Sequence, residues 1–412
     1  MKPLCTNYKQ ATGESPVIRK FLNKLFIDRF RYRRQVAWQA LKDAFFELVL
    51  TSCLPNKIQK QNRLLLIRLD AIGDYILFRN FIETLKKSAK YANYSVTLCG
   101  NILWRDLAEA LDTNFIDRFI WIERSRFRTS LFYRFAILRE IRRSGFSVAL
   151  HSVFSRDFYW GDQIIRHSEA EVRIGFDGDC ANMQARQKIK SAAYYTDLIR
   201  DTVPHRFEFD RNRFFFETCS QSIADVKKPN VTVEKKAEFK NSIVIFPGAS
   251  QAWKQWPIAA YAEICNLLLK KTKSELLICG AASDIELAKH IVGVSTEPPR
   301  IKNLAGKTSL LELAQILSSC KLLVSNDTSA VHIAAAVSAK AIVAISAGNH
   351  YGRFLPYPRF AGLRMVCVFP DSIEKMPEKQ RIGLYHENSL GTTITTIEVK
   401  SVLNAIRRCG IK

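Results

Sequence analysis

Asp74 stands where a predicted strand turns into a helix, a position from which a carboxylate can move a proton. It follows Gly73 directly after the apolar run LLLIRL at residues 64–69. A carboxylate held there can act as a general base and accept a proton from a substrate hydroxyl. The alternative is that Asp74 only caps the helix that follows it.

The segment from Asn326 to His332 joins another predicted strand to an alanine-rich helix. Thr328 and Ser329 would present hydroxyl and backbone N–H groups at a helix N-terminus, where a phosphate is readily bound. Asp327 would repel a phosphate, so we expect it to cap the helix, to orient its neighbours or to accept a hydroxyl from a substrate. A simple N-cap is the alternative for this aspartate.

A third candidate segment is FPGASQAWKQWP at residues 246–257, which contains Gly248, Ser250 and Lys254. It starts at a strand end, passes through a loop of small residues and stops at a proline that can begin a helix. Lys254 lies between two tryptophans, and a lysine held there can act as a point charge on a diphosphate. A solvated lysine is the alternative.

No sequence motif indicates a metal or a bound cofactor. Asp177-Gly178-Asp179 has a D-x-D form, but so short a pattern arises easily by chance, and we expect no metal there. The turn at Gly73 lacks the other glycines of G-x-G-x-x-G, and no G-x-x-x-x-G-K-[ST] occurs, so neither an NAD site nor a P-loop is supported.

The elements that must position these residues alternate between strand and helix, which is typical of parallel α/β sheets. Two such alternations, separated by the charged segment 227–240, predict one Rossmann-like domain over 61–235 and another over 236–412. The last helix may be expected to pack back across the domains. Ligands of such domains bind at the carboxyl ends of the strands or between the domains.

The charge of the chain predicts an anionic partner. Its 412 residues include 62 Lys and Arg against 39 Asp and Glu, a net charge of +23. Residues 1–60 predict a basic amphipathic helical extension, and residues 19–34 could lie on an anionic membrane surface. The alternative is a helix packed on the body with a solvated basic face. A second run of arginines extends from Arg124 to Arg143.

Taken together, the motifs resemble glycosyltransferase family 9, the ADP-heptose:lipopolysaccharide heptosyltransferases and their relatives. The resemblance covers about residues 62–358 and rests on four segments in the family's order, which are RLDAIGD (68–74), RIGFD (173–177), FPGASQAWKQWP (246–257) and NLAGKTSLLELAQILSSCKLLVSNDTSAVHIAAA (303–336). It implies a GT-B fold, in which two Rossmann-like doubly wound domains face a cleft. The first domain would hold the acceptor and the second the nucleotide-sugar.

The resemblance also implies an inverting transfer of heptose or a related sugar to a lipopolysaccharide core or another cell-surface glycan. Asp74 matches the family's catalytic base and Lys254 its diphosphate-binding lysine, while Asp327, Thr328 and Ser329 match its sugar- and phosphate-binding loop. The donor is a substrate, and neither a cofactor nor a metal is expected. Such an enzyme would be cytoplasmic and peripheral on the inner face of the cytoplasmic membrane, with a glycolipid or glycan acceptor.

Further candidate contacts complete the predicted site. Gly248, Ser250 and His332 are assigned to the donor side, and the remaining candidates for the donor or the acceptor are Arg68, Gly73, His350 and Arg353. The chain departs from the family where Ser329-Ala330 replace the common Gly-Pro, and where Ala282 stands at a position that can be acidic.

Two other functions are compatible with parts of the sequence. A GT-B relative such as a nucleotide-sugar epimerase would release its sugar without an acceptor. A nucleic-acid-binding protein would account for the net charge of +23 and for the basic and aromatic runs. No recognised nucleic-acid motif is present and the charge clusters outside the predicted site, so nucleic acid is not an expected partner.

Overall fold

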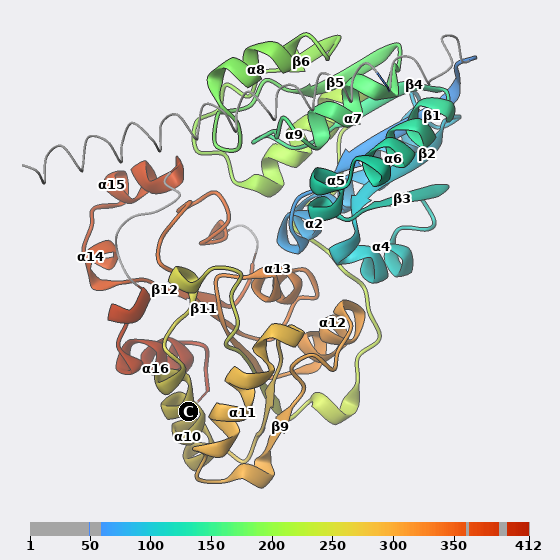
Figure 1. Cartoon of the computed structure of the whole chain (residues 1–412). Coiled ribbons are helices and arrows are strands. Elements are labelled where there is room, and N and C mark those ends of the chain that lie inside the picture. The colour runs from blue at the N-terminus through green and yellow to red at the C-terminus, as the bar shows by residue number, and fades with distance from the viewer. Residues whose placement is uncertain (1–48, 50–58, 360–361, 387–393, 412) are drawn as a thin grey trace, which may run out of the picture. The chain divides into compact units, whose positions relative to one another are not determined.

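The computed structural model describes residue 49 and residues 59–359, 362–386 and 394–411 (Figure 1). The predicted extension over residues 1–60, including the basic segment 19–34, therefore lies almost wholly outside the described residues. Within the described part, no helix has the length and hydropathy needed to cross a membrane. The chain from Ile58 to Lys412 forms one compact unit.

The first half of this unit forms a parallel six-stranded sheet in the order β3-β2-β1-β4-β5-β6. Its strands are β1 (Gln61–Arg68), β2 (Ser95–Asn101), β3 (Arg118–Ile122), β4 (Phe146–His151), β5 (Val172–Phe176) and β6 (Asp197–Ile199). Its helices are α2 (Ile72–Phe78), α3 (Asn80–Lys87), α4 (Arg105–Leu111), α5 (Arg124–Thr129), α6 (Leu131–Arg143), α7 (Gly161–Ser168), α8 (Ala185–Ala192) and α9 (Glu208–Ser220). This is the strand order of a dinucleotide-type Rossmann sheet. The order in which successive strands are added reverses between β1 and β4.

The second half repeats the same order, β12-β11-β10-β7-β8-β9, again with parallel strands. Its strands are β7 (Ser242–Phe246), β8 (Glu275–Ile278), β9 (Ile301–Asn303), β10 (Leu322–Asn326), β11 (Ile342–Ile345) and β12 (Met365–Val368). Its helices are α10 (Ile258–Lys271), α11 (Ile285–Gly293), α12 (Leu310–Ser319), α13 (Ser329–Ala336), α14 (Asp371–Glu374), α15 (Glu378–Gly383) and α16 (Val399–Arg408). Here the strand order reverses between β7 and β10.

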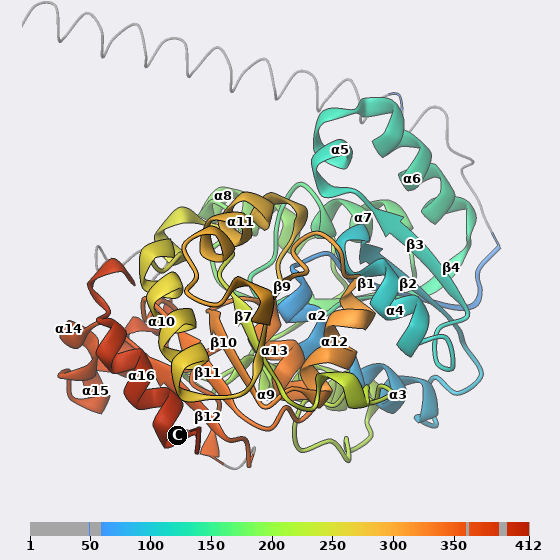
Figure 2. The same ribbon diagram turned by 90° about the horizontal axis from the view of Figure 1, so that it is seen from below.

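The two sheets confirm the predicted α/β class and its doubly wound topology. The domain limits 61–235 and 236–412 remain predictions. Helix α16 packs on β11 and β12 of the second sheet and on helix α10 of the same half. Figure 2 shows α10 between α16 and α11.

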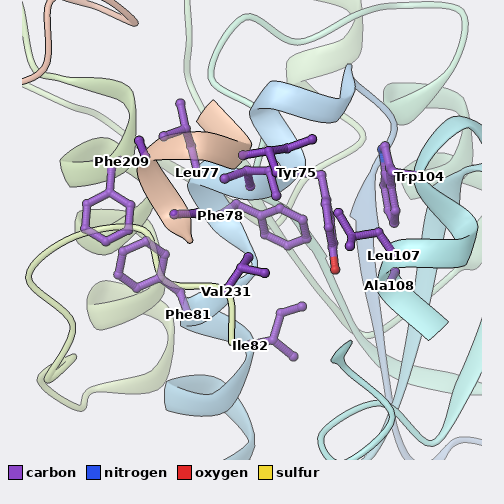
Figure 3. Packing of buried hydrophobic residues seen from close by; sticks show 14 of the residues in the cluster. Tyr75, Leu77, Phe78, Phe81, Ile82, Trp104, Leu107, Ala108, Phe209 and Val231 are labelled. Carbon is purple, nitrogen blue, oxygen red and sulfur yellow. The ribbon is translucent and has the colours of Figure 1, made fainter. Parts of the chain in front are cut away.

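Helix α2 follows β1, and its last four residues, from Tyr75 to Phe78, are buried. Tyr75, Leu77 and Phe78 are each fully buried, because α2 packs against both α9 and α13 (Figure 3). The Tyr75 ring stacks on Trp104 with ring centroids 4.5 Å apart. This packing holds the first turn of α2, which carries Gly73 and Asp74, in a fixed position.

Candidate functional site

All three predicted segments follow strands at which the strand order of a sheet reverses. Asp74 lies just beyond β1, the segment 247–257 follows β7, and the segment 327–332 follows β10. In open α/β sheets these switch points are where ligands bind. Moreover, α2 and α13 pack against each other, so the structure brings the first segment to the third.

The contact between α2 and α13 is closest at Gly73 and His332. A Cβ atom added to Gly73 would lie 2.7 Å from Cδ2 of the His332 ring, closer than non-bonded carbons approach. The ring itself is held by Tyr357, whose hydroxyl lies 2.9 Å from Nδ1 of His332. Because residue 73 is a glycine, the first turn of α2 can contact helix α13 directly next to Asp74.

This contact predicts the effect of adding a single methyl group. Gly73→Ala should destabilise the protein by about 1 to 3 kcal/mol, although alanine favours a helix, because the His332 ring cannot move without losing Tyr357. Urea unfolding measures the change. Adding His332→Ala to the same chain should restore most of the lost stability, and a double variant as unstable as Gly73→Ala would refute the contact.

Asp74 is partly exposed and caps its own helix with one oxygen. Its Oδ2 accepts a hydrogen bond from the N–H of Ala71 at 3.3 Å. Among the described residues, Oδ1 has no hydrogen-bond partner, so it is open to a substrate. The capping role and the proposed catalytic role are therefore compatible, since they use different oxygens of the same carboxylate.

A second carboxylate, Asp70, accompanies Asp74 and was not singled out by the sequence. Burial and the charge of Asp74 raise the pKa of Asp70 to about 7, against the lowering effect of Arg68. Arg68 and Asp70 form an ion pair with a distance of 2.8 Å between Nη2 and Oδ2. The one signal in the sequence for this ion pair is the spacing of Arg68 and Asp70, which are two residues apart.

Arg68 was a candidate contact for donor or acceptor, and the structure gives it several protein partners. Its Nη1 donates to the backbone oxygen of Ser152 at 2.9 Å and to Oδ1 of Asn212 at 2.7 Å, in addition to the pair with Asp70. The side chain is fully buried and its guanidinium lies 5.0 Å from the centre of the Phe78 ring. This arrangement favours a structural role, in which Arg68 fixes the loops around Asp74.

On the second sheet, Asn326 ties the loop after β7 to the end of β10. Its Nδ2 donates to the backbone oxygen of Pro247 at 2.7 Å, and its Oδ1 accepts from the N–H of Trp256 at 3.1 Å. Trp256 is fully buried, so both ends of the segment that carries Lys254 are anchored. The sequence placed Asn326 in the right segment but gave no sign that its amide bridges two loops.

The residues after Asn326 start helix α13. Asp327 accepts a hydrogen bond from the Ser346 hydroxyl at 3.1 Å, and Thr328 is the N-cap residue with its hydroxyl 3.2 Å from Oγ of Ser325. The side chain of Asp327 thus points to β11 and does not cap the helix. Ser329 is the first residue of α13, so its N–H stands at the helix terminus as predicted.

Lys254, Asp327, Asp74 and the two histidines lie within electrostatic range of one another. Burial lowers the pKa of His332, while the charges of Asp327 and Asp74 raise it and that of Lys254 lowers it. Burial likewise lowers the pKa of His350, and Lys254 and Asp327 act on it in the same directions. The net lowering favours the neutral form of both imidazoles, and Lys254 is a cation whose charge acts on both of them, as that of Arg353 acts on His350.

The remaining donor-side residues lie on the loop before Lys254. Gly248 approaches Asp284 so closely that a Cβ atom would lie 2.1 Å from the Asp284 carboxylate oxygen, so no larger residue fits. Asp284 in turn accepts from the N–H of Ala281 at 2.8 Å. Ser250 is exposed, and the Lys254 ammonium lies 5.1 Å from the centre of the Trp253 ring. Asp284 escaped the sequence analysis because only the fold brings it to Gly248.

Arg353 was also a candidate contact, but its guanidinium is committed to a buried ion pair. Its Nε lies 2.9 Å from Oε2 of Glu208, and Nη2 donates to Oγ of Ser155 at 3.0 Å. The N–H of Glu208 donates to the backbone oxygen of Arg353 at 2.9 Å. Because Glu208 begins α9 and Arg353 lies beyond β11, this pair joins the two sheets, which favours a structural role for Arg353.

The pair predicts a large loss of stability when Arg353 is removed. Burial alone would raise the pKa of Glu208, but the charges of Arg353, Arg211 and Arg68 lower it to about 2. Arg353→Ala should reduce the free energy of unfolding by about 3 kcal/mol, because a buried carboxylate loses its main partner. Urea unfolding at neutral pH measures this loss.

The pH dependence provides the control for this prediction. A carboxyl group whose pKa is lower in the folded protein stabilises it above the ordinary pKa of 4.5 and loses that effect as the pH falls toward 2. The difference between wild type and Arg353→Ala should therefore shrink over that interval. Arg353→Lys should retain part of the effect, and a difference that is the same at all pH values would contradict the ion-pair account.

The D-x-D carboxylates have protein partners. Asp177 lies 3.3 Å from the Lys188 ammonium, and Asp179 accepts from Oγ of Ser155 at 3.1 Å. Arg353 approaches Asp179 to 4.0 Å. In the part of the chain that the structure describes, no three His, Cys, Asp or Glu side chains gather in a way that could hold a metal ion.

Two Rossmann-like sheets of identical strand order, with the candidate residues at both switch points, define the GT-B class of glycosyltransferase fold. Solved structures share this fold. A glycosyl transferase family 9 protein from Veillonella parvula has a TM-score of 0.62 at 17% identity, with 86% of this chain and 98% of that chain covered. The E. coli heptosyltransferase WaaC with ADP has a TM-score of 0.64 at 15% identity, with 84% and 99% covered.

The sequence comparisons point to one family. Residues 163–359 match the model of glycosyltransferase family 9 (heptosyltransferase), which confirms the resemblance drawn from the motifs. The lipopolysaccharide core heptosyltransferase OpsX of Haemophilus influenzae is 26% identical over 42% of this chain and 49% of its own length. Lipooligosaccharide heptosyltransferase 2 of Haemophilus ducreyi is 30% identical over 47% and 56%. The chain thus spans about half the length of these curated relatives.

Proposed function

We propose that the protein is an inverting glycosyltransferase. It would move heptose or a related sugar from a nucleotide diphosphate-sugar to a lipopolysaccharide core or another cell-surface glycan. The observation that carries the proposal is the contact of Gly73 with His332, because it brings Asp74 next to helix α13 of the second sheet. The similarity to family 9 over residues 163–359 supports the same activity.

The second sheet supplies the groups that would bind the donor. The bond that breaks joins the anomeric carbon of the sugar to a diphosphate oxygen, and negative charge grows on that oxygen. The Lys254 ammonium and the N–H groups at the start of α13 are suited to stabilise this charge. His332 and His350, whose pKa values are lowered by burial, would add no positive charge of their own, and Asp327 would accept a hydrogen bond from a sugar hydroxyl.

The first sheet supplies the base. Oδ1 of Asp74 would take the proton of the acceptor hydroxyl while the hydroxyl oxygen attacks the anomeric carbon from the side opposite to the diphosphate. The proton then rests on Asp74 and the nucleoside diphosphate leaves, so charges and atoms balance in one displacement. A single displacement of this kind inverts the anomeric configuration.

The comparisons suggest which donor and acceptor to try. The E. coli heptosyltransferase WaaC, which shares the fold, was solved with ADP, and the similar curated proteins are named for lipopolysaccharide or lipooligosaccharide, so ADP-heptose and a lipopolysaccharide core are the first pair to test. We expect the protein to work on the cytoplasmic side of the membrane. The basic segment 19–34 would add an attraction to anionic lipid.

Product analysis tests this proposal. The protein is incubated with the donor, with and without acceptor, and the anomeric configuration of the product is determined by NMR. The proposal expects a glycoside of inverted configuration that forms only with acceptor. Retained configuration would exclude a single displacement by Asp74, and sugar released or epimerised without acceptor would favour the epimerase alternative.

A further inference from the structure

The edge of the first sheet at the ends of β2 and β3 carries an unusual group of exposed apolar side chains. Ile102 and Leu103 follow β2 and are 41% and 61% exposed. Leu131 and Phe132 begin α6 and are 41% and 90% exposed. These four, here called the apolar edge, account for a large part of the exposed large apolar residues among those described, the others being Val172, Ile189, Val203, Ile223, Trp253, Val294 and Ile382.

The two parts of the apolar edge follow neighbouring strands. Strands β2 and β3 lie side by side, and Asn101 at the end of β2 pairs in register with Ile122 at the end of β3. Ile102 and Leu103 come directly after β2, and Leu131 and Phe132 come after β3 and the short helix α5, so all four belong to the segments that leave the carboxyl ends of these two strands. Helices α5 and α6 contact each other, and Figure 2 shows them together beyond β3.

Phe132 is held outward by its neighbours. Ser130 caps α6 by accepting a hydrogen bond from the N–H of Tyr133 at 3.3 Å. The Tyr133 hydroxyl bonds to the backbone of Trp121 at 3.2 Å and of Glu123 at 3.1 Å, which fixes that side chain toward β3. Successive residues of a helix point about 100° apart, so fixing Tyr133 inward directs Phe132 toward solvent.

Arginines without carboxylate partners surround this edge. Among the described residues, none of Arg126, Arg128 and Arg139 forms an ion pair, whereas Arg124 acts on the carboxylate of Asp157 and Arg105 pairs with Glu109. The guanidinium of Arg124 lies 4.3 Å from the centre of the Trp160 ring, and that of Arg126 lies 4.7 Å from the Tyr133 ring. Aromatic stacking orients both cations, and the charge of Arg126 has no carboxylate paired with it among the described residues.

We propose that this face docks on the surface of an anionic phospholipid bilayer. Phe132 and Leu131 enter the region below the headgroups, while Arg126, Arg128 and Arg139 meet the lipid phosphates. An exposed aromatic residue beside cations is the combination that binds at such an interface, because apolar burial and electrostatic attraction add. The binding itself does not depend on the proposed glycosyl transfer.

The location has a consequence that does rest on the proposed function. Because β2 lies next to β1, the apolar edge and Asp74 share the carboxyl edge of one sheet. Docking by this edge turns Asp74 toward the membrane surface. An acceptor whose lipid part stays in the bilayer could then present its sugar hydroxyl to Asp74 without leaving the membrane.

Vesicle sedimentation tests the docking with the full chain. Wild type, Phe132→Glu and the control Ile223→Glu are mixed with vesicles of phosphatidylcholine alone or with phosphatidylglycerol added. Ile223 is 91% exposed and follows α9, so it matches Phe132 in exposure but lies outside the apolar edge. We expect binding only to the anionic vesicles, about tenfold weaker for Phe132→Glu and unchanged for Ile223→Glu. Equal binding of all three proteins would overturn the proposal.

Fluorescence locates the contact independently of the rest of the chain. Phe132→Trp and Ile223→Trp each add one tryptophan at an exposed position. On vesicles that contain brominated lipid, the added emission of Phe132→Trp should shift to the blue and be quenched, and that of Ile223→Trp should not. If neither responds while the protein still binds, another segment such as 19–34 makes the contact. If an RNA oligonucleotide, and not lipid, depends on Phe132, the face binds nucleic acid; either result refutes the proposal.

Discussion

Asp74→Asn should reduce the rate of sugar transfer about a thousandfold while the affinity for the donor stays nearly the same. The amide keeps the hydrogen bond to the Ala71 N–H if its oxygen takes the place of Oδ2, so the helix start is preserved. It cannot accept the proton of the acceptor hydroxyl. Single-turnover transfer measures the rate, and calorimetry on the same protein measures donor binding.

Asp70→Asn is the matched control for this prediction. Asp70 has its pKa raised to about 7, which alone would suit a base at neutral pH, but both its oxygens are occupied by Arg68. We therefore expect Asp70→Asn to cost much less activity than Asp74→Asn. The reverse order, with turnover lost only in Asp70→Asn, would move the base from Asp74 to Asp70.

Lys254→Ala should weaken donor binding by about ten- to a hundredfold, because a charged hydrogen bond to the diphosphate is lost. The segment around Lys254 is anchored by Asn326 and by the buried Trp256, so the loop should keep its course in the variant. Titration of the donor measures the change in dissociation constant. Lys254→Arg keeps the charge, so its dissociation constant for the donor should lie between those of wild type and Lys254→Ala.

Lys270→Ala provides the comparison for Lys254. Lys270 is exposed in the last turn of α10, so its removal alters the net charge by the same amount at another place. Donor affinity should not change in Lys270→Ala. Equal weakening in both variants would show a general effect of charge, and no weakening in Lys254→Ala would remove this lysine from the diphosphate site.

The central strands and the loops that follow them could be predicted from the sequence. The runs that form β1, β7 and β10 are apolar over their length and end in polar or small residues, because strands buried on both faces need such sequences. The segment Leu310–Ser319 has the apolar periodicity of a helix and forms α12 over the same limits, where Ser309 and Glu312 form a capping box.

The sequence pattern does not reveal the short strands at the sheet edges or the break between α2 and α3. β6 and β9 have three residues each, one of them charged, so no apolar run marks them. β12 is an apolar run of only four residues, of which Val368 alone is buried, and so short a run does not distinguish a strand from a loop. The sequence from Tyr75 to Lys90 has the periodicity of a single helix. The structure instead has α2 and α3, separated at Arg79, whose guanidinium donates to the Asn230 backbone oxygen at 2.7 Å. That partner is 151 residues away, and no local pattern reveals it.

The contacts that assemble the candidate site were also beyond the sequence. Gly73 and His332 could each be assigned to a motif, but their meeting depends on how α2 packs on α13. The same holds for Arg353. In the sequence it is a cation in a loop and therefore a candidate ligand contact, whereas in the structure it pairs with Glu208, 145 residues before it. The sequence located the loops, and tertiary packing determines which side chains remain free in them.

The most direct test of the proposed site is a calorimetric titration of the purified protein with ADP-, GDP-, UDP- and dTDP-linked sugars, each with and without Mg²⁺. The account predicts that one of these donors binds, that the corresponding nucleoside diphosphate competes with it, and that the binding is lost in Lys254→Ala. A panel in which no donor binds wild type, or in which binding is the same in wild type and Lys254→Ala, would contradict the claim that the switch points of the two sheets form a nucleotide-sugar site.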